Sequence, residues 1–425
     1  MVGLSHANRW VWRRLVLILA PKASTKVAIN IQTHPTTSLL CTMIPPSKPL
    51  LLMAWLTSNN GILRRHLIYR HICATQATSP RITPLINDSI ANINCINCFS
   101  VAHRVIDHVL QTSRFEPNQI IAPKLNFTDV TTDAPLLHAT IPPTFHHFYN
   151  GSLPDFVETP KSKKPKRKYR TSSYRIDLAY RGTDFCGWQT QDKHGSKELP
   201  LPAVQDLVQA AVNHRDVRVA GRTDAGVHAV GQVGRVRCDS QVTLEKLSQQ
   251  LQEAAIQSGS WTCRRIMPVS RSFHPIFEAT SRSYVYLLDA NSDTESIYGD
   301  FLALVPRVND LLAPLVGQSL PYAALSYKQT KTQNSDCLLS HAQVRYLKLD
   351  SQPVLSIELT GNRFLRRMVR ILVSTTLFLA AESNANYGSE ALLQIIRAKD
   401  RTSAARPAPS EGLVFMTASF EQNKL

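Results

Sequence analysis

The second half of the chain alternates apolar and polar residues in several short runs. One run occupies residues 175–180, and two more, at 217–220 and 227–236, flank a turn that has a glycine at each end. Further runs occupy residues 261–269 and 354–359. A period of two residues is typical of a β-strand, so the pattern predicts a strand in each of these segments.

Other stretches repeat their apolar residues every three or four positions and predict helices. In residues 203–214 these side chains form a one-sided stripe that suits a helix packed on a sheet. Thr243 is a good N-cap for a second helix, which we expect to extend to residue 255. Residues 307–318 are a third candidate, and residues 363–372 combine an apolar side with four arginines at helical spacing. The mixture predicts an α+β fold with helices on one face of the sheet.

Residues 1–160 lack sustained periodicity, and scattered prolines argue against an independent core. The segment has no acidic residue before Asp88, and its apolar runs, at 15–20 and 50–56, are too short to span a bilayer. From Met53 onward it is rich in Arg, Ser and Thr, as organellar transit peptides are. We expect a poorly ordered extension with a targeting region for a mitochondrion or plastid. A start of translation at Met53 would make residues 1–52 an over-extended reading frame. The alternative is an extension without a targeting role, in a nuclear or cytoplasmic protein.

The chain is basic, with 48 Lys and Arg against 31 Asp and Glu and a net charge of +17. Residues 161–170 carry 7 basic residues and no acidic one, whereas residues 171–425 carry 28 basic and 24 acidic residues. Excess positive charge indicates a polyanionic partner, and a targeting segment explains it equally well. The run at 161–168 fits a linker, an RNA-contacting arm or a nuclear-localisation signal, and in each case it precedes the folded part.

The eight cysteines are scattered and indicate free thiols in a reducing compartment. Cys95 and Cys98 form a single Cys-x-x-Cys pair. Because a structural zinc site needs four ligands and no second pair is present, this pair predicts no metal site.

The most informative stretch is the turn at residues 221–229, with the sequence GRTDAGVHA. Its glycines permit a positive φ or a close backbone approach, and the turn carries Arg222 and Asp224 two residues apart. An Asp beside a Gly is usually only a turn residue. The whole nonapeptide, however, resembles the signature loop of the TruA family of tRNA pseudouridine synthases, in which this Asp is the nucleophile.

Further segments resemble motifs of the same family in the same order. Residues 181–189 (RGTDFCGWQ) are similar to its first motif, and residues 273–287 (FHPIFEATSRSYVYL) to its second. Residues 360–372 (TGNRFLRRMVRIL) resemble its Asn-x-Phe-Leu-x-x-Met-Val-Arg segment, and residues 408–415 (APSEGLVF) its closing motif. The resemblance extends over residues 174–418.

The chain departs from the family pattern at a few positions. Cys186 stands where an aromatic residue is more common, Ile276 replaces an arginine, and Ser374 replaces a glycine. Residues 317–337 match poorly, so a different RNA target or a catalytically silent RNA-binding relative is the alternative function.

Alternation within the second motif places Arg282, Tyr284 and Tyr286 on one face of a strand. We therefore expect the guanidinium and both rings to lie in one cleft. A tyrosine-rich sheet face without a site is the alternative.

The resemblance implies two similar halves, residues 171–297 and 298–425, that form an extended, mostly antiparallel sheet around a central basic cleft. Residues 161–170 would be the linker before them. The implied activity is isomerisation of uridine to pseudouridine in the anticodon stem-loop of tRNA, at positions 38–40. The implied enzyme is a homodimer that needs no metal or other cofactor and no membrane.

The resemblance also implies the roles of single residues. Asp224 would be the nucleophile and Arg370 its charge partner, while Tyr284 would stack on the flipped base and take part in proton transfer. His228 would be structural. The residues expected to bind the substrate RNA are Arg222, Tyr284, Arg282, Gly187 and Gln189.

Overall fold

The structure is a computed structural model. It describes residues 11–17, 27–33, 39–40, 53–57, 63–67, 96–113, 115–116, 119–120, 125–130, 141–154, 171–190, 201–213, 215–239, 241–327, 334–382 and 388–420. The chain divides into two units, residues 1–80 and residues 81–425.

The described residues of the first unit form five strands. They are β1 (Val11–Leu17), β2 (Val27–Thr33) and β3 (Leu39–Leu40) in one antiparallel sheet, and β4 (Met53–Thr57) and β5 (Leu63–Leu67) in a hairpin. The rest of the expected targeting region and the basic linker lie outside the described residues.

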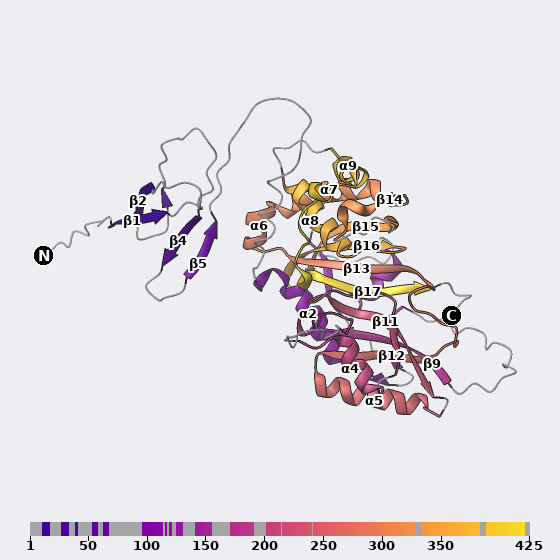
Figure 1. The fold of residues 1–425 in the computed structure, drawn as a ribbon. Helices are drawn as coiled ribbons and strands as arrows, with labels where there is room; N and C mark the ends of the chain where they lie inside the picture. The colour runs from indigo at the N-terminus through magenta and orange to yellow at the C-terminus, as the bar shows by residue number, and fades with distance from the viewer. Residues whose placement is uncertain are drawn as a thin grey trace. The chain divides into compact units, whose positions relative to one another are not determined.

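A ten-stranded sheet forms the body of the second unit (Figure 1). Its main path runs through β12 (Trp261–Pro268), β9 (Thr171–Tyr180), β11 (His228–Asp239), β17 (Leu413–Phe420), β13 (Ala279–Asp289), β16 (Gln352–Gly361), β15 (Asp336–Leu349) and β14 (Ser319–Pro321). Two short strands lie off this path, β10 (Val217–Val219) beside β11 and β8 (Phe127–Asp129) beside β15. A separate hairpin joins β6 (Phe115–Glu116) and β7 (Gln119–Ile120). These pairings confirm the predicted fold class, a mixed fold with a mostly antiparallel sheet.

The centre of the sheet is its one parallel pairing among the described strands, between β11 and β17. His228 lies opposite Val414 and Ala229 opposite Phe415. The last strand of the chain therefore lies between β11 and β13 (Figure 1). The strand that follows the Asp224 loop is therefore hydrogen-bonded to a strand almost two hundred positions later in the chain.

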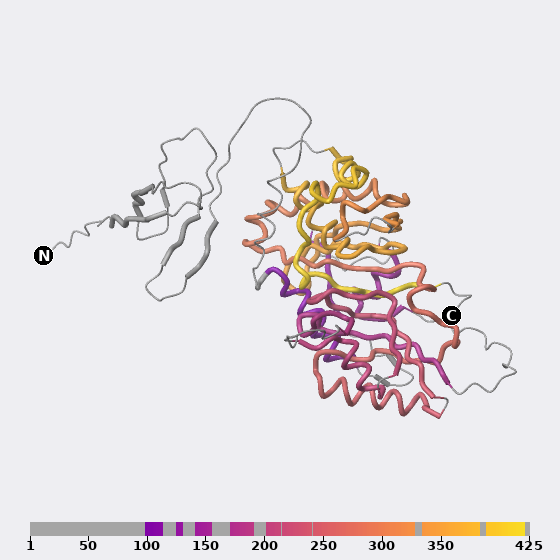
Figure 2. The backbone as a smooth tube through the Cα atoms, in the orientation of Figure 1, coloured from indigo at the N-terminus to yellow at the C-terminus, as the bar shows by residue number. Residues whose placement is uncertain are grey.

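Six helices of the described residues gather in two groups, one toward each end of the sheet (Figures 1 and 2). They are α4 (Val204–Ala211) and α5 (Leu244–Ser258) in one group, and α6 (Ser292–Tyr298), α7 (Phe301–Leu312), α8 (Met368–Ala381) and α9 (Ala391–Ala398) in the other. In the first group α4 packs on α5 and α5 on β12, and in the second α7 packs on β15 and α8. Thr243 caps α5, because its Oγ1 accepts a hydrogen bond from the Lys246 amide at 3.3 Å.

The described residues between 96 and 154 differ from the expected poorly ordered extension, because they contain α2 (Ser100–Thr112) and α3 (Pro143–Tyr149) and pack into the core. The carboxylate of Asp289, at the end of β13, accepts hydrogen bonds from the amides of Ser100 at 2.8 Å and Val101 at 3.0 Å. A carboxylate at a helix N-terminus satisfies its free N–H groups and its partial positive charge.

The second part of this segment covers the face of the sheet opposite the candidate site. The Tyr149 hydroxyl donates to the carboxylate of Glu358 at 2.6 Å. On β16, Leu359 lies opposite Tyr284, and its neighbour Glu358 therefore points to the other face. Residues 96–154 thus bind strands from both halves of the sheet.

The sequence pattern did not predict the structure of this segment, and the reason is physical. The buried residues of α2 repeat at helical spacing, at Val101, Val105, Ile106 and Val109, but a single short helix between proline-rich stretches has no core of its own. Its apolar side packs on β9, β11 and β13, all of which lie at Thr171 or later in the chain.

Candidate active site

A cleft of about 620 Å³ lies in the second unit, on the Tyr284 face of the sheet. Three stretches of chain form most of its wall: the turn after β10, the loop after β9, and the segment that leads into α8. The polar and charged lining residues are Cys186, Gln189, Thr190, Arg222, Thr223, Asp224, Tyr284, Arg366, Arg367 and Arg370. The structure therefore brings Asp224, Tyr284, Arg370, Arg222, Gly187 and Gln189 to one cleft.

The loop that carries Asp224 is held by close backbone packing. Asp224 pairs with Gly187 in an isolated antiparallel bridge, and the Trp188 amide donates to the Thr223 carbonyl at 3.1 Å. Gly187 has a φ of +114°, and a Cβ there would lie 3.0 Å from the Thr223 carbonyl oxygen. The two backbones can approach this closely only because Gly187 has no side chain. This is a structural reason for glycine in the first motif. The proposed RNA contact of Gly187 stays a prediction.

Side chains below the loop fix it further, and the sequence analysis did not identify them. The Tyr180 hydroxyl and the Thr223 hydroxyl are 2.8 Å apart, and Gln232 Nε2 donates to the Gly221 carbonyl at 2.6 Å. All three side chains are buried. Buried polar groups of this kind hold a loop in one conformation because a broken hydrogen bond would leave them unsatisfied.

His228 occupies a structural position, as the sequence suggested. Its Nδ1 accepts a hydrogen bond from the Gly182 amide at 3.1 Å, and its ring makes an edge contact with His103 of α2. Burial lowers the pKa of His228 to about 3, and the neighbouring His103 adds to this effect. His228 is therefore neutral at physiological pH and links the first motif to the strand after the catalytic turn.

Tyr284 forms the aromatic floor of the cleft. Its ring is in edge-to-face contact with Phe364 at 5.2 Å and with Phe415 at 5.1 Å between centroids. Burial raises the pKa of the Tyr284 phenol, so the group is neutral at physiological pH. Two perpendicular neighbours lock the ring plane, which leaves a rigid surface on which a planar base can stack.

Tyr286 does not join Tyr284 in the cleft, in contrast to the sequence expectation. It is 2 % exposed, makes an edge contact with Phe99 and lies beneath Gly412. The alternation predicted the correct face of β13, but residues before α2 and at the start of β17 cover that end of the strand.

Arg370 lies in the first turn of α8 and is attached to the segment before β17. Its Nε donates to the Ala408 carbonyl at 2.5 Å, and the Ala408 amide donates to the Arg370 carbonyl at 3.0 Å. Ser374, one turn later, donates to the Arg406 carbonyl at 2.5 Å. The hydroxyl that replaces the expected glycine is therefore a fixed link between α8 and residues 406–408.

Asp224 and Arg370 interact at longer range than a direct ion pair. No nitrogen–oxygen contact within 4.0 Å joins them in the described part of the chain. Burial lowers the pKa of Arg370, and the negative charge of Asp224 opposes that effect. The charge complementarity expected from the sequence is thus present in the cleft, with space between the two groups.

Residues 363–372 were expected to form one helix. The first part of this stretch, residues 363–367, is not helical. The helix begins at Met368, and Arg367 has a left-handed backbone with a φ of 58°. The Met368 amide donates to the Leu365 carbonyl at 3.0 Å, which closes a tight turn before the helix. The arginines at 363, 366 and 367 therefore lie on a loop at the cleft.

Arg282 differs most from its predicted role as an RNA contact. Its guanidinium donates to backbone carbonyls of three loops: Ala220 at 3.2 Å, Ile276 at 2.6 Å and Asn362 at 2.8 Å. A fourth bond reaches the Ala279 carbonyl at 3.0 Å. Two of these loops lead directly into Arg222 and the basic segment of the cleft. The geometry assigns Arg282 to positioning the cleft walls.

We expect Arg282→Leu to lower the catalytic rate constant about 100-fold while tRNA affinity and its salt dependence stay close to those of the unchanged protein. The reason is that displacing a catalytic loop by about 1 Å costs roughly this factor without removing a phosphate contact. Arg282→Lys can keep some of these hydrogen bonds. Its catalytic rate constant should lie between those of the leucine variant and the unchanged protein. Single-turnover rates and binding at several salt concentrations measure both effects. A salt slope lower by about one unit would instead place Arg282 on a phosphate.

Arg222 and Gln189 are exposed at the rim of the cleft, where they are accessible to a large ligand. Asp224 is partly buried between them and Arg370. A carboxylate side chain can serve as the nucleophile in covalent catalysis. The arrangement suits covalent catalysis on a planar base that leaves its stack and lies on Tyr284.

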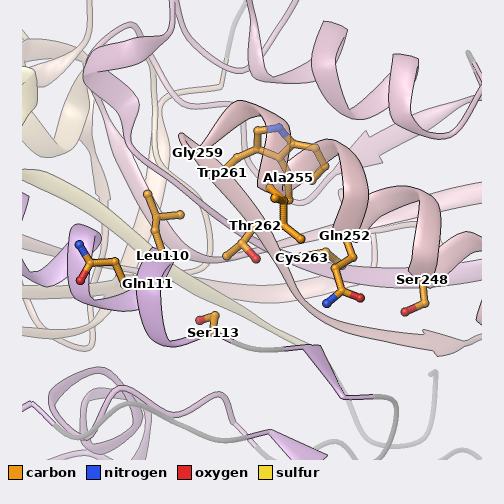
Figure 3. A pocket seen from close by; sticks show the side chains of 11 residues that line it. Leu110, Gln111, Ser113, Ser248, Gln252, Ala255, Gly259, Trp261, Thr262 and Cys263 are labelled. Carbon is orange, nitrogen blue, oxygen red and sulfur yellow. The ribbon is translucent and has the colours of Figure 1, made fainter.

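A second, smaller cavity of about 250 Å³ lies between α2, α5 and β12 (Figure 3). Its lining includes Leu110, Gln252 and Trp261, and no charged side chain (Figure 3). None of the residues predicted for the site lines it. The cluster needed for acid–base or nucleophilic chemistry is in the larger cleft.

Within the described ranges no group of three or more His, Cys, Asp or Glu side chains is arranged to hold a metal ion. Cys238, Cys263 and Cys337 have free thiols, and Cys95 lies outside the described residues. The helices of the described part include none long and apolar enough to cross a membrane.

Comparison with known proteins identifies the family. A family model described as tRNA pseudouridine synthase matches residues 321–421. The tRNA pseudouridine synthase A of Porphyromonas gingivalis is 32% identical over 252 residues, which cover 56% of this chain and 93% of the relative. Those of Stenotrophomonas maltophilia and Bdellovibrio bacteriovorus are each 28% identical, with 59% and 60% of this chain and 96% and 97% of the relatives covered. Among solved structures, a Cbf5–Nop10–Gar1 complex aligns with 48% of this chain and 44% of its own at 9% identity and a TM-score of 0.22, which is too low to support an argument.

These relatives are matched over nearly their whole length, and the cleft that contains Asp224, Tyr284 and Arg370 lies in the part of the fold that the resemblance covers. The chain belongs to the TruA family of tRNA pseudouridine synthases.

Proposed function

We propose that this protein isomerises uridine to pseudouridine in tRNA, with Asp224 as the nucleophile. The observation that carries the proposal is the convergence of Asp224, Tyr284 and Arg370 on one cleft, although they come from three segments far apart in the sequence. The names of the curated relatives, all tRNA pseudouridine synthases, support tRNA as the substrate.

The chemistry needs no oxidant, reductant or nucleotide. The N1–C1′ glycosidic bond breaks, the uracil turns, and a C5–C1′ bond forms, after which C5 loses a proton and N1 gains one. The carboxylate of Asp224 adds to the base at C6 or to the sugar at C1′ and leaves when the new bond has formed. The neutral phenol of Tyr284 supports the extruded uracil and takes part in the proton transfer.

The finer proposals follow from the resemblance and the charge distribution. The expected targets are uridines 38–40 in the anticodon stem-loop, bound by a homodimer through the basic cleft. Arg222 and Gln189, at its rim, are proposed RNA contacts. A targeting region within the N-terminal extension, with its Arg-, Ser- and Thr-rich stretch from Met53 onward, is proposed to direct the protein to a mitochondrion or plastid.

The direct test is incubation of the full-length protein with unmodified tRNA, followed by mapping of pseudouridine at single-nucleotide resolution. The full chain is required, because residues 96–154 belong to the core of the fold. Pseudouridine at positions 38–40 is the expected result. Modification elsewhere would overturn the target positions, and salt-sensitive binding without modification would favour a silent RNA-binding relative.

A further inference from the structure

We propose that Tyr327, Arg366 and Arg367 form a clamp for a phosphodiester of the RNA next to the target nucleotide. This set of three residues is called the arginine clamp below. The family motif leaves the two positions between Leu365 and Met368 open, and this chain has arginine at both. The inference deepens the proposed function and rests on it, because it takes the ligand of the cleft to be RNA.

The clamp has a defined geometry. The guanidinium of Arg367 lies over the Tyr327 ring at 4.3 Å from its centroid, and that of Arg366 lies at 5.4 Å. The Tyr327 amide donates to the Arg366 carbonyl at 3.1 Å. One ring therefore holds two flexible cationic side chains in place, which reduces the entropy they would lose on binding a ligand.

The backbone at Arg367 is strained in a way that supports a functional role. In the described residues, the other positive-φ positions without glycine are Asn213, Asp350 and Lys399. Asn and Asp tolerate this region, and Lys399 ends α9, where a left-handed residue is common. Arg367 instead precedes a helix and has a long side chain, so its conformation costs of order 1 kcal/mol and must be maintained by its surroundings.

The charges at the cleft favour an anion. Its lining contains one acidic residue, Asp224, against the arginines at 222, 366, 367 and 370. In the described part of the chain, neither arginine of the clamp has a carboxylate within 4.0 Å. The buried Nε of Arg367 also has no hydrogen-bond partner there. The N-terminal end of α8, one residue later, adds partial positive charge.

A phosphodiester is the ligand that fits these observations. Guanidinium groups bind its two free oxygens through paired hydrogen bonds, which lysine cannot reproduce. Arg366 and Arg367 line the same cleft as Asp224 and Tyr284, so a bound phosphate would belong to the strand that contains the flipped nucleotide. Contacts to phosphate fix register and orientation and carry no sequence information directly.

The test uses the full-length protein and an unmodified tRNA transcript, with binding measured from about 50 to 200 mM salt. For the double variant Arg366→Gln and Arg367→Gln we expect affinity to fall about 10- to 100-fold and the salt slope to fall by about one unit per phosphate lost. The loss should appear as a rise in the KM for tRNA by a similar factor. Arg307→Gln removes one positive charge from α7, outside the cleft lining, and should leave both the affinity and the salt slope unchanged.

Tyr327 separates this arrangement from simple excess charge. Tyr327→Phe keeps the ring and should bind tRNA as the unchanged protein does, whereas Tyr327→Leu should weaken binding about tenfold with the net charge unaltered. Equal affinity of the leucine variant would overturn the role of the ring. An unchanged affinity and salt slope in the double glutamine variant would overturn the clamp as a whole.

The clamp and the proposed function can fail separately. If the unchanged protein makes pseudouridine and the double variant binds tRNA equally well, the clamp is wrong and the function stands. If the unchanged protein makes no pseudouridine but the double variant loses salt-dependent tRNA binding, the clamp stands and the activity is wrong.

Discussion

Replacing Asp224 with alanine should abolish pseudouridine formation while tRNA affinity stays within about threefold. Removal of a covalent nucleophile typically costs about 10⁴-fold or more in rate, because no other group takes over bond formation. The Asp224 side chain contributes little to RNA affinity, since a carboxylate repels phosphates. Single-turnover assays with mapped pseudouridine measure the rate, and filter binding at fixed salt measures the affinity.

Two further variants sharpen this prediction. Asp224→Asn keeps the shape of the side chain and should be as inactive as the alanine variant, because an amide is not a nucleophile. Asp310→Ala removes an exposed carboxylate from α7 and should leave the rate unchanged. Substantial pseudouridine formation by the asparagine variant would show that Asp224 is not the nucleophile.

Arg370→Leu should lower the rate by about 10²- to 10³-fold, which is the usual cost of removing one preorganised electrostatic contact in an active site. The cause is the loss of the positive charge that acts on Asp224 across the cleft. The variant also loses the hydrogen bond to the Ala408 carbonyl, so its folding must be checked by thermal unfolding. Single-turnover kinetics on folded protein give the rate.

Arg370→Lys is the matched control for charge. It retains a cation near Asp224. Its single nitrogen cannot both donate to the Ala408 carbonyl and replace the two terminal nitrogens of the guanidinium. We expect it to recover about tenfold over the leucine variant. Leucine and lysine variants with equal rates would mean that Arg370 acts by holding residues 406–408 and not by its charge on Asp224.

The two mutations address different parts of one cleft, and their combination is informative. If Arg370 acts only through Asp224, the double variant Asp224→Ala and Arg370→Leu should be no slower than Asp224→Ala alone. Groups that act as a unit behave in this non-additive way. A further loss in residual rate or in tRNA affinity would indicate a separate contact of Arg370 with the RNA.

Much of the fold and the candidate site could be predicted from the sequence because local chemistry determines it. The alternation in residues 175–180 and 354–359 predicted β9 and β16, and Thr243 predicted the start of α5. These features depend on pleat periodicity and on a cap, which act over a few residues. The nonapeptide around Asp224 was likewise recognisable from its nine contiguous residues alone.

The remaining features depend on contacts between distant segments. Arg282 was expected to bind RNA, and only the fold shows that the carbonyls of Ala220, Ile276 and Asn362 surround its guanidinium. Tyr286 was expected in the cleft, but residues from both ends of the described fold cover it. Helical spacing placed the arginines at 363–367 in a helix, whereas the turn closed by Leu365 and Met368 prevents one.

By itself, the sequence determined the α+β class, several of the strands and helices, and the set of side chains suited to the chemistry, because each follows from local periodicity or from a contiguous motif. The tertiary structure alone decided that residues 96–154 belong to the core, that Arg282 positions loops, and that Arg366 and Arg367 meet over Tyr327. The physical reason is that these outcomes depend on which backbone groups and rings are brought together across the sheet, and no local pattern in the chain encodes that proximity.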